Sequence, residues 1–310
     1  MRHLVRRSAA ACALPLLALA AGTAAAQTAP PSFGHGSGKL LLTGGVSSID
    51  GAAGGGLTPW AVIGSYATEH EFGGTAHLTR VKTQDYALGA YGAALGLHDR
   101  VELSLARQDF DTGSTGNALG LPGLHLKQDI VGAKLRVAGD AVVDSDTLMP
   151  QIAVGIEHKR LHAGGLASTL DALGAKTRGT DLYLSATKLF LAQGVLANLT
   201  LRATKANQNG LLGFGGSEHT GYSLQPEVSL AWLLRKNLAI GAEFRAKPDN
   251  LDPSLLGNGL KEDDWADVFV AWAPSKNLSL TLAWVDLGRI VPAVATRRQT
   301  GAYLSAQVAY

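Results

Sequence analysis

Hydrophobic and polar residues alternate with a period of two along most of the chain. In residues 100–110, for example, Leu103 and Leu105 fall on one face of a strand, and Glu102 and Ser104 fall on the other. The same alternation recurs in two further segments, residues 149–160 and 226–234. These segments span about 9–12 residues, which is the length that a tilted β-strand needs to cross a bilayer. The pattern therefore predicts membrane-crossing strands with one apolar and one polar face.

Connections of two lengths separate the predicted strands. We predict fourteen strands, near residues 39–49, 58–68, 74–83, 86–97, 100–110, 127–138, 149–160, 180–190, 195–207, 220–234, 238–248, 265–273, 278–288 and 301–310. Tight turns lie at 97–100, 191–194, 235–237 and 274–277, whereas the connections at 111–126, 161–179, 208–219, 249–264 and 289–300 are long. Because long and short connections alternate, all long loops are expected at one end of the sheet, and only the short turn at 84–85 departs from this order.

The resulting fold class is all-β, a transmembrane antiparallel up-and-down β-barrel with an even number of strands. Fourteen strands is the first expectation; segment 39–49 is the weakest, and if it lies inside the barrel the parity favours twelve. The chain ends on an alternating face that runs from Ala302 to the terminal Tyr310. A final strand of this kind is read by the barrel-assembly machinery, which we therefore expect as a partner.

Residues 1–26 have the pattern of a secretory signal peptide. Arg2, Arg6 and Arg7 precede a short apolar stretch, and small residues precede Gln27. Removing these three arginines changes the net charge from +2 to −1, so the basic balance implies no nucleic-acid partner. We expect residues 27–310 to form the barrel domain, in the outer membrane of a Gram-negative cell and in contact with its lipid and lipopolysaccharide. Charged residues make up 17% of the chain, below the roughly 25% of soluble proteins, as suits a lipid-facing wall.

If the apolar faces meet lipid, the opposite faces line the lumen. The lining set contains six basic and five acidic residues: Glu102, Lys134, Arg136, Glu157, Lys159, Arg202, Glu227, Glu243, Arg245, Lys247 and Asp267. This near balance argues against strong selectivity for anions or cations. Fourteen strands would enclose a lumen roughly 28 Å across, too wide for inward side chains alone to fill, so we expect water, folded-in loops or both. The charges line a solute path or form ion pairs that hold the wall together.

Two glycine-rich stretches invite a test for phosphate binding. Residues 51–56 read Gly-Ala-Ala-Gly-Gly-Gly, but no Lys-Ser or Lys-Thr follows, so the Walker pattern fails. We predict a flexible loop or a segment folded into the barrel mouth. Residues 210–216 are predicted to form an extracellular loop that narrows the entrance.

Two long loops carry opposite charge. Loop 249–264 is acidic and includes Asp263 and Asp264, whereas loop 289–300 carries Arg289, Arg297 and Arg298 without an acid. Three hypotheses remain open: the loops latch at the mouth, the acidic group binds a divalent ion while the arginines hold lipopolysaccharide phosphates, or both loops are simply solvated.

The chain shows no enzymatic motif. We weigh His125, His158, His162 and His219 as candidate catalytic bases. The run Ser217-Glu218-His219 comes nearest to placing a nucleophile beside a base, and Ser217 and His219 share a face only if that loop is extended. The lone Cys12 lies within the signal, which excludes a cysteine metal cluster in the mature protein. We predict no catalytic site, no metal site and no cofactor.

Several stretches resemble a known bacterial family. They are Lys39–Ile49, Gly51–Trp60, Asp99–Ser104, Pro150–Gly155, Ala186–Gln193, Leu211–Gly216 and Phe269–Pro274. Together they resemble the domain of unknown function 3034 family, and the similarity covers nearly all of the mature chain. The resemblance implies an outer-membrane barrel but supplies no catalytic or binding residues.

The sequence therefore predicts a passive channel or uptake protein for small solutes. The alternatives are a closed structural or surface-interaction barrel plugged by its loops and, less favoured, an outer-membrane hydrolase.

Overall fold

The computed structural model describes residues 32–33, 38–142, 147–217, 219–251 and 257–310. The predicted signal peptide, residues 1–26, lies outside this range. No helix in the described ranges is long and apolar enough to cross a membrane.

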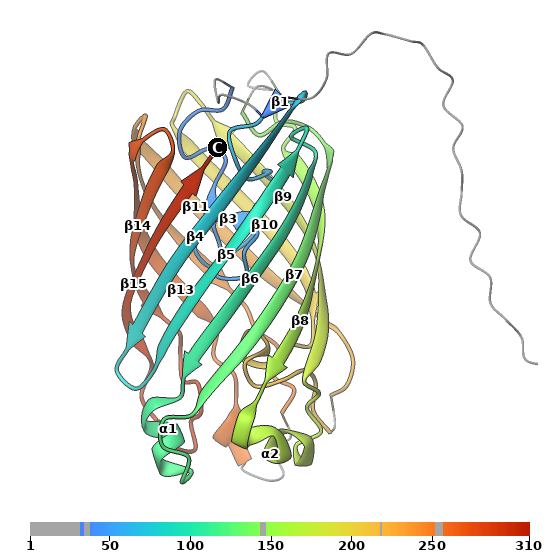
Figure 1. Cartoon of the computed structure of the whole chain (residues 1–310), viewed down its shortest axis with the longest axis vertical. Coiled ribbons are helices and arrows are strands. Elements are labelled where there is room, and N and C mark those ends of the chain that lie inside the picture. The colour runs from blue at the N-terminus through green and yellow to red at the C-terminus, as the bar shows by residue number, and fades with distance from the viewer. Residues whose placement is uncertain (1–31, 34–37, 143–146, 218, 252–256) are drawn as a thin grey trace, which may run out of the picture. The chain divides into compact units, whose positions relative to one another are not determined.

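Twelve antiparallel strands form a closed barrel (Figure 1). They are β4 (Glu71–Thr83), β5 (Ala87–Leu97), β6 (Val101–Asp111), β7 (His125–Ala138), β8 (Gln151–His162), β9 (Arg178–Phe190), β10 (Val195–Thr204), β11 (Ser223–Arg235), β12 (Leu238–Arg245), β13 (Trp265–Ser275), β14 (Leu278–Asp286) and β15 (Thr300–Ala309). Each strand pairs with the next in sequence, and β15 closes the sheet on β4 in a register that runs from Gly301 opposite Thr83 to Ala309 opposite Thr75. The predicted all-β antiparallel barrel is confirmed.

The wall has twelve strands, which is the number that the sequence favours if segment 39–49 lies inside the barrel. The first two predicted strands, 39–49 and 58–68, are not part of the wall. Segment 39–49 contains only the two-residue strand β2 (Val46–Ser47). This strand pairs with a second two-residue strand, β3 (Ala53–Gly54), which lies between the two segments. A further short strand, β1 (Ser32–Phe33), runs parallel to β4.

The wall has its apolar side chains on the outside. Leu105, Leu230 and Leu282 are 60%, 54% and 59% exposed on the outer face, whereas inward neighbours such as Ser104 and Thr281 are buried. A water-soluble barrel has the reverse arrangement, because exposing large apolar side chains to water costs free energy. The alternation in the sequence therefore corresponds to an apolar exterior and a polar interior.

Connections of different length lie at the two ends of the barrel. Tight turns follow β5, β9, β11 and β13, and the C-terminal Tyr310 is at this short-turn end, where its backbone exchanges hydrogen bonds of 2.9 and 3.0 Å with Gly74. The long connection between β7 and β8, residues 139–150, also joins these strands at the short-turn end, so the prediction that all long loops share one end is wrong for this connection. The long-loop end carries α1 (Gly113–Ala118), α2 (Ala167–Ala172) and the 3₁₀ turns η1 (Gly164–Leu166), η2 (Asn207–Gly210) and η3 (Gly257–Leu260) (Figure 1).

Candidate functional site: a lumen filled from both ends

The segment before β4 folds into the barrel lumen, and we call residues 43–67 the N-terminal plug. Every residue from Val46 to Ala67 is buried. The plug begins and ends at the short-turn end, where Lys39 Nζ donates a hydrogen bond of 2.8 Å to the carbonyl of Ile63 and Thr68 contacts the first residue of β4. Figure 1 shows this segment in blue among the strands. The plug is thus a loop that enters and leaves through one opening.

Two wall carboxylates bind the plug backbone. Glu102 on β6 accepts hydrogen bonds from the amides of Ala53 (3.0 Å) and Gly64 (2.7 Å). Glu243 on β12 accepts from the amides of Gly56 (2.6 Å) and Leu57 (2.7 Å). Each of these two side chains thus accepts hydrogen bonds from two amides of the plug, and together they anchor the plug to opposite parts of the wall.

Glycine at the plug tip permits this close approach. A Cβ atom on Gly55 would lie 2.0 Å from Oε1 of Glu243, so any other residue would displace this carboxyl group from its hydrogen bonds to the plug. The sequence of residues 51–56 had invited a phosphate-loop interpretation. Amides of this stretch do bind an acidic group, but the group is the Glu243 side chain of the protein itself.

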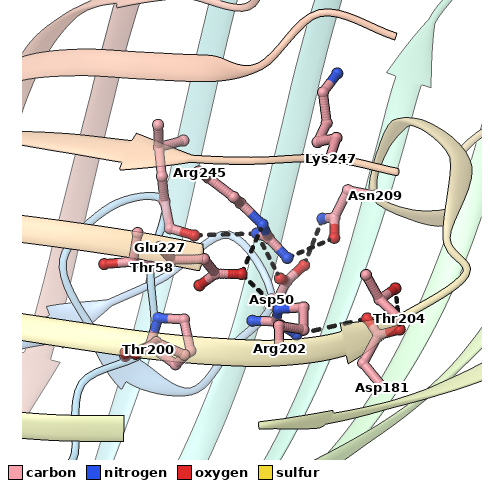
Figure 2. Close-up of polar contacts among 12 residues, drawn as sticks. Asp50, Thr58, Asp181, Thr200, Arg202, Thr204, Asn209, Glu227, Arg245 and Lys247 are labelled. Carbon is pink, nitrogen blue, oxygen red and sulfur yellow. Dashed lines mark hydrogen bonds and ion pairs between the residues drawn. The ribbon is translucent and has the colours of Figure 1, made fainter. Parts of the chain in front are cut away.

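A buried cluster of charged side chains fills the middle of the lumen (Figure 2). We call it the central charge cluster: Asp50 from the plug with Glu157, Lys159, Asp181, Arg202, Glu227 and Arg245 from the wall, none more than 3% exposed. Asp50 Oδ2 lies 3.0 Å from Arg245 Nη1 and 3.4 Å from Lys159 Nζ. Burial alone would raise the pKa of Asp50, but Lys159 and Arg245 outweigh it and hold that pKa well below its usual range. The plug therefore contributes an ionised carboxylate to the cluster.

The wall residues of the cluster also pair with one another. Arg202 contacts Glu157 at 2.7 Å and Glu227 at 2.5 Å. Lys159 lies 3.0 Å from Asp181, and Arg245 lies 3.2 Å from Glu227. Each wall cation thus has a wall carboxylate as partner without Asp50. This matters because an unpaired buried charge is costly.

The connection between β10 and β11 fills the lumen from the long-loop end. We call residues 206–216, all of which are buried, the inner loop. Asn209 donates to Asp50 (2.7 Å) and accepts from Lys159 (2.7 Å) and Arg245 (2.9 Å), so the inner loop meets the plug within the central charge cluster. Gln208 and Asn209 have φ of 45° and 59°, a left-handed conformation that non-glycine residues adopt at an energetic cost.

The two segments close the lumen. Lys159 has an exposed fraction of 0%, and Arg202 of 1%, so no water-accessible path passes these side chains. A cavity of about 550 Å³ remains at the short-turn end, lined by Lys39, Asp99, Arg136, Asp140 and Gln151 among others. In this state the barrel has a vestibule but no continuous pore within its described residues.

The predicted lumen residues occupy two places in the structure. Ten of them, Glu102, Lys134, Glu157, Lys159, Arg202, Glu227, Glu243, Arg245, Lys247 and Asp267, are buried inside the barrel. Lys134 pairs with Glu102 at 3.1 Å, Lys247 pairs with Glu262 at 3.0 Å, and Asp267 lies opposite Glu243 in the β12–β13 register. Arg136 instead lies at the vestibule, with Asp99 (2.5 Å) and Asp140 (3.1 Å).

Three polar residues of the site were not predicted. Asp181 shares an inward face of β9 with Tyr183 and Ser185, so the alternation could have identified it. Asp50 and Asn209 lie in the plug and the inner loop. The sequence allows segment 39–49 to lie inside the barrel and residues 51–56 to fold into its mouth, but no local pattern identifies Asp50 or Asn209 as a partner of the wall charges.

The two oppositely charged loops meet at the long-loop end. Arg289 forms a two-pronged pair with Asp263 (2.7 and 2.8 Å), which holds the pKa of Asp263 at about 2. Arg298 pairs with Asp286 (2.9 Å), and Arg297 pairs with Asp85 (2.6 Å) in the turn after β4. Asp264 accepts a hydrogen bond of 3.1 Å from the amide of Lys247.

These contacts bear on the two binding hypotheses for the loops. All three arginines have carboxylate partners, and the pair of Arg289 with Asp263 joins the two loops as the latch hypothesis expects. The described residues contain no group of three side chains that could hold a metal ion. Part of the acidic loop, residues 252–256, lies outside the described ranges.

The histidines weighed for catalysis do not converge on the lumen. His125, His158 and His162 are on the outer face of the wall, where His125 pairs with Asp109 (2.5 Å) and His162 with Asp129 (2.9 Å). His219 follows the inner loop, and its carbonyl accepts from the amide of Gly216 at 2.9 Å. The intervening Glu218 lies outside the described residues.

The chain is similar to one protein family in sequence and to several outer-membrane proteins in structure. A family model described as "Protein of unknown function (DUF3034)" matches residues 43–307. No curated protein matched the chain. Among solved structures, "NanC porin" is similar with a TM-score of 0.49 and 7% identity over 76% of this chain and 98% of that chain. "KdgM porin" has a TM-score of 0.48 and 10% identity (76% and 99% covered), and outer membrane phospholipase A from Escherichia coli has 0.43 and 8% (76% and 92% covered).

Proposed function

The chain belongs to the DUF3034 family, as its sequence motifs predicted, and from this premise we propose that it is a gated channel for small solutes in the outer membrane. In the resting state the N-terminal plug and the inner loop close the lumen. The channel opens when the plug moves toward the short-turn end.

The apolar exterior of the wall supports the membrane location. Large apolar side chains cover the outside of all twelve strands, and a band of this kind is stable only in lipid. Outer-membrane barrels have short periplasmic turns and long extracellular loops. We therefore place the short-turn end in the periplasm and the long-loop end outside the cell. Export by residues 1–26 and assembly through the last strand, which ends at Tyr310, belong to the same proposal.

The pairing of the wall charges supports a channel that opens. If the barrel were permanently closed, an apolar filling would be at least as stable as buried ion pairs. Instead the wall cations of the central charge cluster have wall carboxylates as partners, such as Arg202 with Glu157 and Glu227. Withdrawal of the plug would thus leave a polar, internally paired surface that water can hydrate. This is the observation on which the proposal mainly depends.

The course of the plug supports opening from the periplasm. Both of its ends lie at the short-turn end, and a Cβ atom on Gly38 would lie 3.4 Å from Cβ of Thr68. The plug can therefore leave the lumen without pulling a chain end through it. Because Gly38 and Thr68 lie close together, the residues between them can be deleted and Gly38 joined directly to Thr68.

The proposal can be tested by electrical recording in planar bilayers. We compare the intact mature protein with a variant that lacks residues 39–67, in which Gly38 is joined directly to Thr68. The intact protein is expected to show rare openings, and the deletion variant a large, steady conductance. A folded deletion variant without conductance would contradict the channel and favour a closed structural barrel.

A second variant tests whether movement of the plug is required. Ser47 Oγ donates a hydrogen bond of 2.7 Å to Oε1 of Gln307 on β15. In the double variant Ser47→Cys, Gln307→Cys, a short bifunctional thiol reagent joins the plug to the wall, and the mature chain has no other cysteine. Cross-linking should abolish the rare openings, whereas the same reagent on either single variant should leave them unchanged. Openings that persist after cross-linking would mean that solutes pass by another route.

A further inference from the structure

A group of charged side chains lies on the outside of the wall at the long-loop end. They project from strands β4 to β9, and each cation lies within four residues of the end of its strand. The exposed cations are Arg80, Lys82, Arg107, Lys127, Arg160 and Arg178. Three histidines of the same face, His125, His158 and His162, lie among them.

The other half of the barrel lacks such cations. In strands β10 to β15, the outward positions of the long-loop half carry no lysine or arginine in the described structure. Apolar side chains such as Leu224, Val268 and Trp284 occupy outward positions there. Charge on a lipid-facing surface costs up to about 2–4 kcal/mol at the membrane midplane and least near the interface. We call the surface that carries the six exposed cations the cationic face. Because these cations lie on one side of the barrel only, solubility does not explain them.

The strand register places two arginines directly opposite each other. Arg160 on β8 pairs in register with Arg178 on β9, and neither forms an ion pair with a described residue. The nearest carboxylate in register with Arg160 is Asp129, which already accepts from Arg107 (2.6 Å) and His162 (2.9 Å). Like charges directly opposite on neighbouring strands destabilise a sheet. An anion held between these two arginines would remove that repulsion.

An apolar groove lies beside the cationic face. It has a volume of about 560 Å³ and is lined by Tyr91, Gly92, Ala93, Leu105, Arg107 and Val131, among others. Ala93 leaves the hollow because its outward side chain is small, and Leu105 and Val131 form its apolar sides. Arg107 belongs to both the groove and the cationic face, and the register continues from it through Asp129 to Arg160 and Arg178. An apolar groove that continues into a cluster of cations matches an acyl chain attached to a phosphorylated head group.

We propose that the outer face of β5 to β9 is a binding site for lipopolysaccharide, in which Arg160 and Arg178 hold a lipid A phosphate and the groove below Arg107 holds an acyl chain. Lipopolysaccharide is the phosphorylated lipid of the outer leaflet, where the proposed membrane placement puts the long-loop end. The site thus depends on that placement, but it does not depend on whether the lumen opens. It also differs from the loop arginines 289, 297 and 298, which have carboxylate partners.

Binding can be measured on the mature protein in detergent micelles by native mass spectrometry with purified lipid A. The test variant is Arg160→Gln with Arg178→Gln. The matched control is Arg235→Gln with Lys236→Gln, which removes the same charge from the exposed short-turn end of β11. We expect the test variant to bind lipid A at least about tenfold more weakly, because two charge-assisted contacts are lost, and the control to bind within about twofold of the unaltered protein. Equal affinities for the two double variants would overturn the proposal.

Further measurements distinguish a loss of lipid recognition from a loss of folding. Lipid A without its phosphates should bind the unaltered protein about as weakly as intact lipid A binds the test variant. Phosphatidylglycerol that binds as tightly as lipid A would show that the occupant is a phospholipid and would overturn the assignment. The variant Ala93→Trp fills the groove without changing charge and should also weaken binding, whereas Arg160→Lys with Arg178→Lys should retain most of it. Because no conductance is recorded, failure here is distinct from failure of the channel.

Discussion

Replacing Asp50 by asparagine tests whether the central charge cluster holds the plug in place. Both hydrogen bonds to Asp50 Oδ1, from Gln108 (3.1 Å) and Asn209 (2.7 Å), can persist with an asparagine carbonyl. Oδ2, in contrast, faces Arg245 at 3.0 Å and Lys159 at 3.4 Å. In the variant an NH₂ group would face these two cations. The substitution therefore removes two ion pairs at nearly constant volume.

The expected magnitude follows from the burial of these groups. Removing one partner of a buried ion pair typically costs about 3–5 kcal/mol. Lys159 and Arg245 keep Asp181 and Glu227 as partners, so we expect a value near the lower end, about 3 kcal/mol, against the closed state. At 1.4 kcal/mol for each factor of ten, the ratio of open to closed channels should rise roughly 100- to 200-fold.

Single-channel recording measures this ratio directly as open probability. The matched control is Ser48→Ala, because the Ser48 hydroxyl is buried in the same plug and has no hydrogen-bond partner among the described residues. That variant should differ from the unaltered protein by no more than a few-fold. If Asp50→Asn left the open probability unchanged while deletion of the plug raised it, the cluster would not be what holds the plug.

Three further predictions concern the plug, the inner loop and the wall. Gly55→Val should open the channel, because its Cβ would lie 2.0 Å from the Glu243 carboxylate; bilayer recordings check this, and a closed variant would refute the close approach. Burial raises the pKa of Glu262 to about 7, so folding favours its protonated form, and the inner loop should lose stability as pH rises from about 4.5 through 7. In the unaltered protein the conductance noise should therefore grow over this pH range, and in the Glu262→Gln variant it should not depend on pH. If the variant kept the pH profile of the unaltered protein, Glu262 would not be the origin of the effect. The barrel should migrate differently before and after boiling in detergent gels, and identical migration would argue against a closed barrel.

The wall of the barrel could be predicted from the sequence because its information is local. The alternation around residues 102 and 103 predicts that Leu103 points outward and Glu102 inward, as the structure shows. The same alternation holds along the other strands of the wall. The plug could not be predicted in the same way. Residues 39–49 resemble a strand only weakly, and a pattern of this kind does not distinguish a strand of the wall from a segment packed against the polar side of that wall.

The candidate site depends on contacts between distant parts of the chain. Asp50 meets Lys159 and Arg245, which are more than a hundred residues away in sequence, and it does so only because the plug folds back into the lumen. The alternation of the wall strands predicts the inward charges of the wall but not their partners in the plug. Glycine-rich residues 51–56 carried a signal of close backbone approach, and only the fold identifies Glu243 as the group that approaches.

The return of the plug to the end at which it starts also has a topological consequence. Among the residues that the structure describes, no segment is threaded from one end to the other through the ring that β4 and β15 close, so the described wall and plug are not linked as a knot would link them. The ring can close first and receive the plug afterwards, or close around a plug already in place, and both orders lead to the same structure. Assembly of the wall in the membrane and docking of the plug are therefore separable steps of folding.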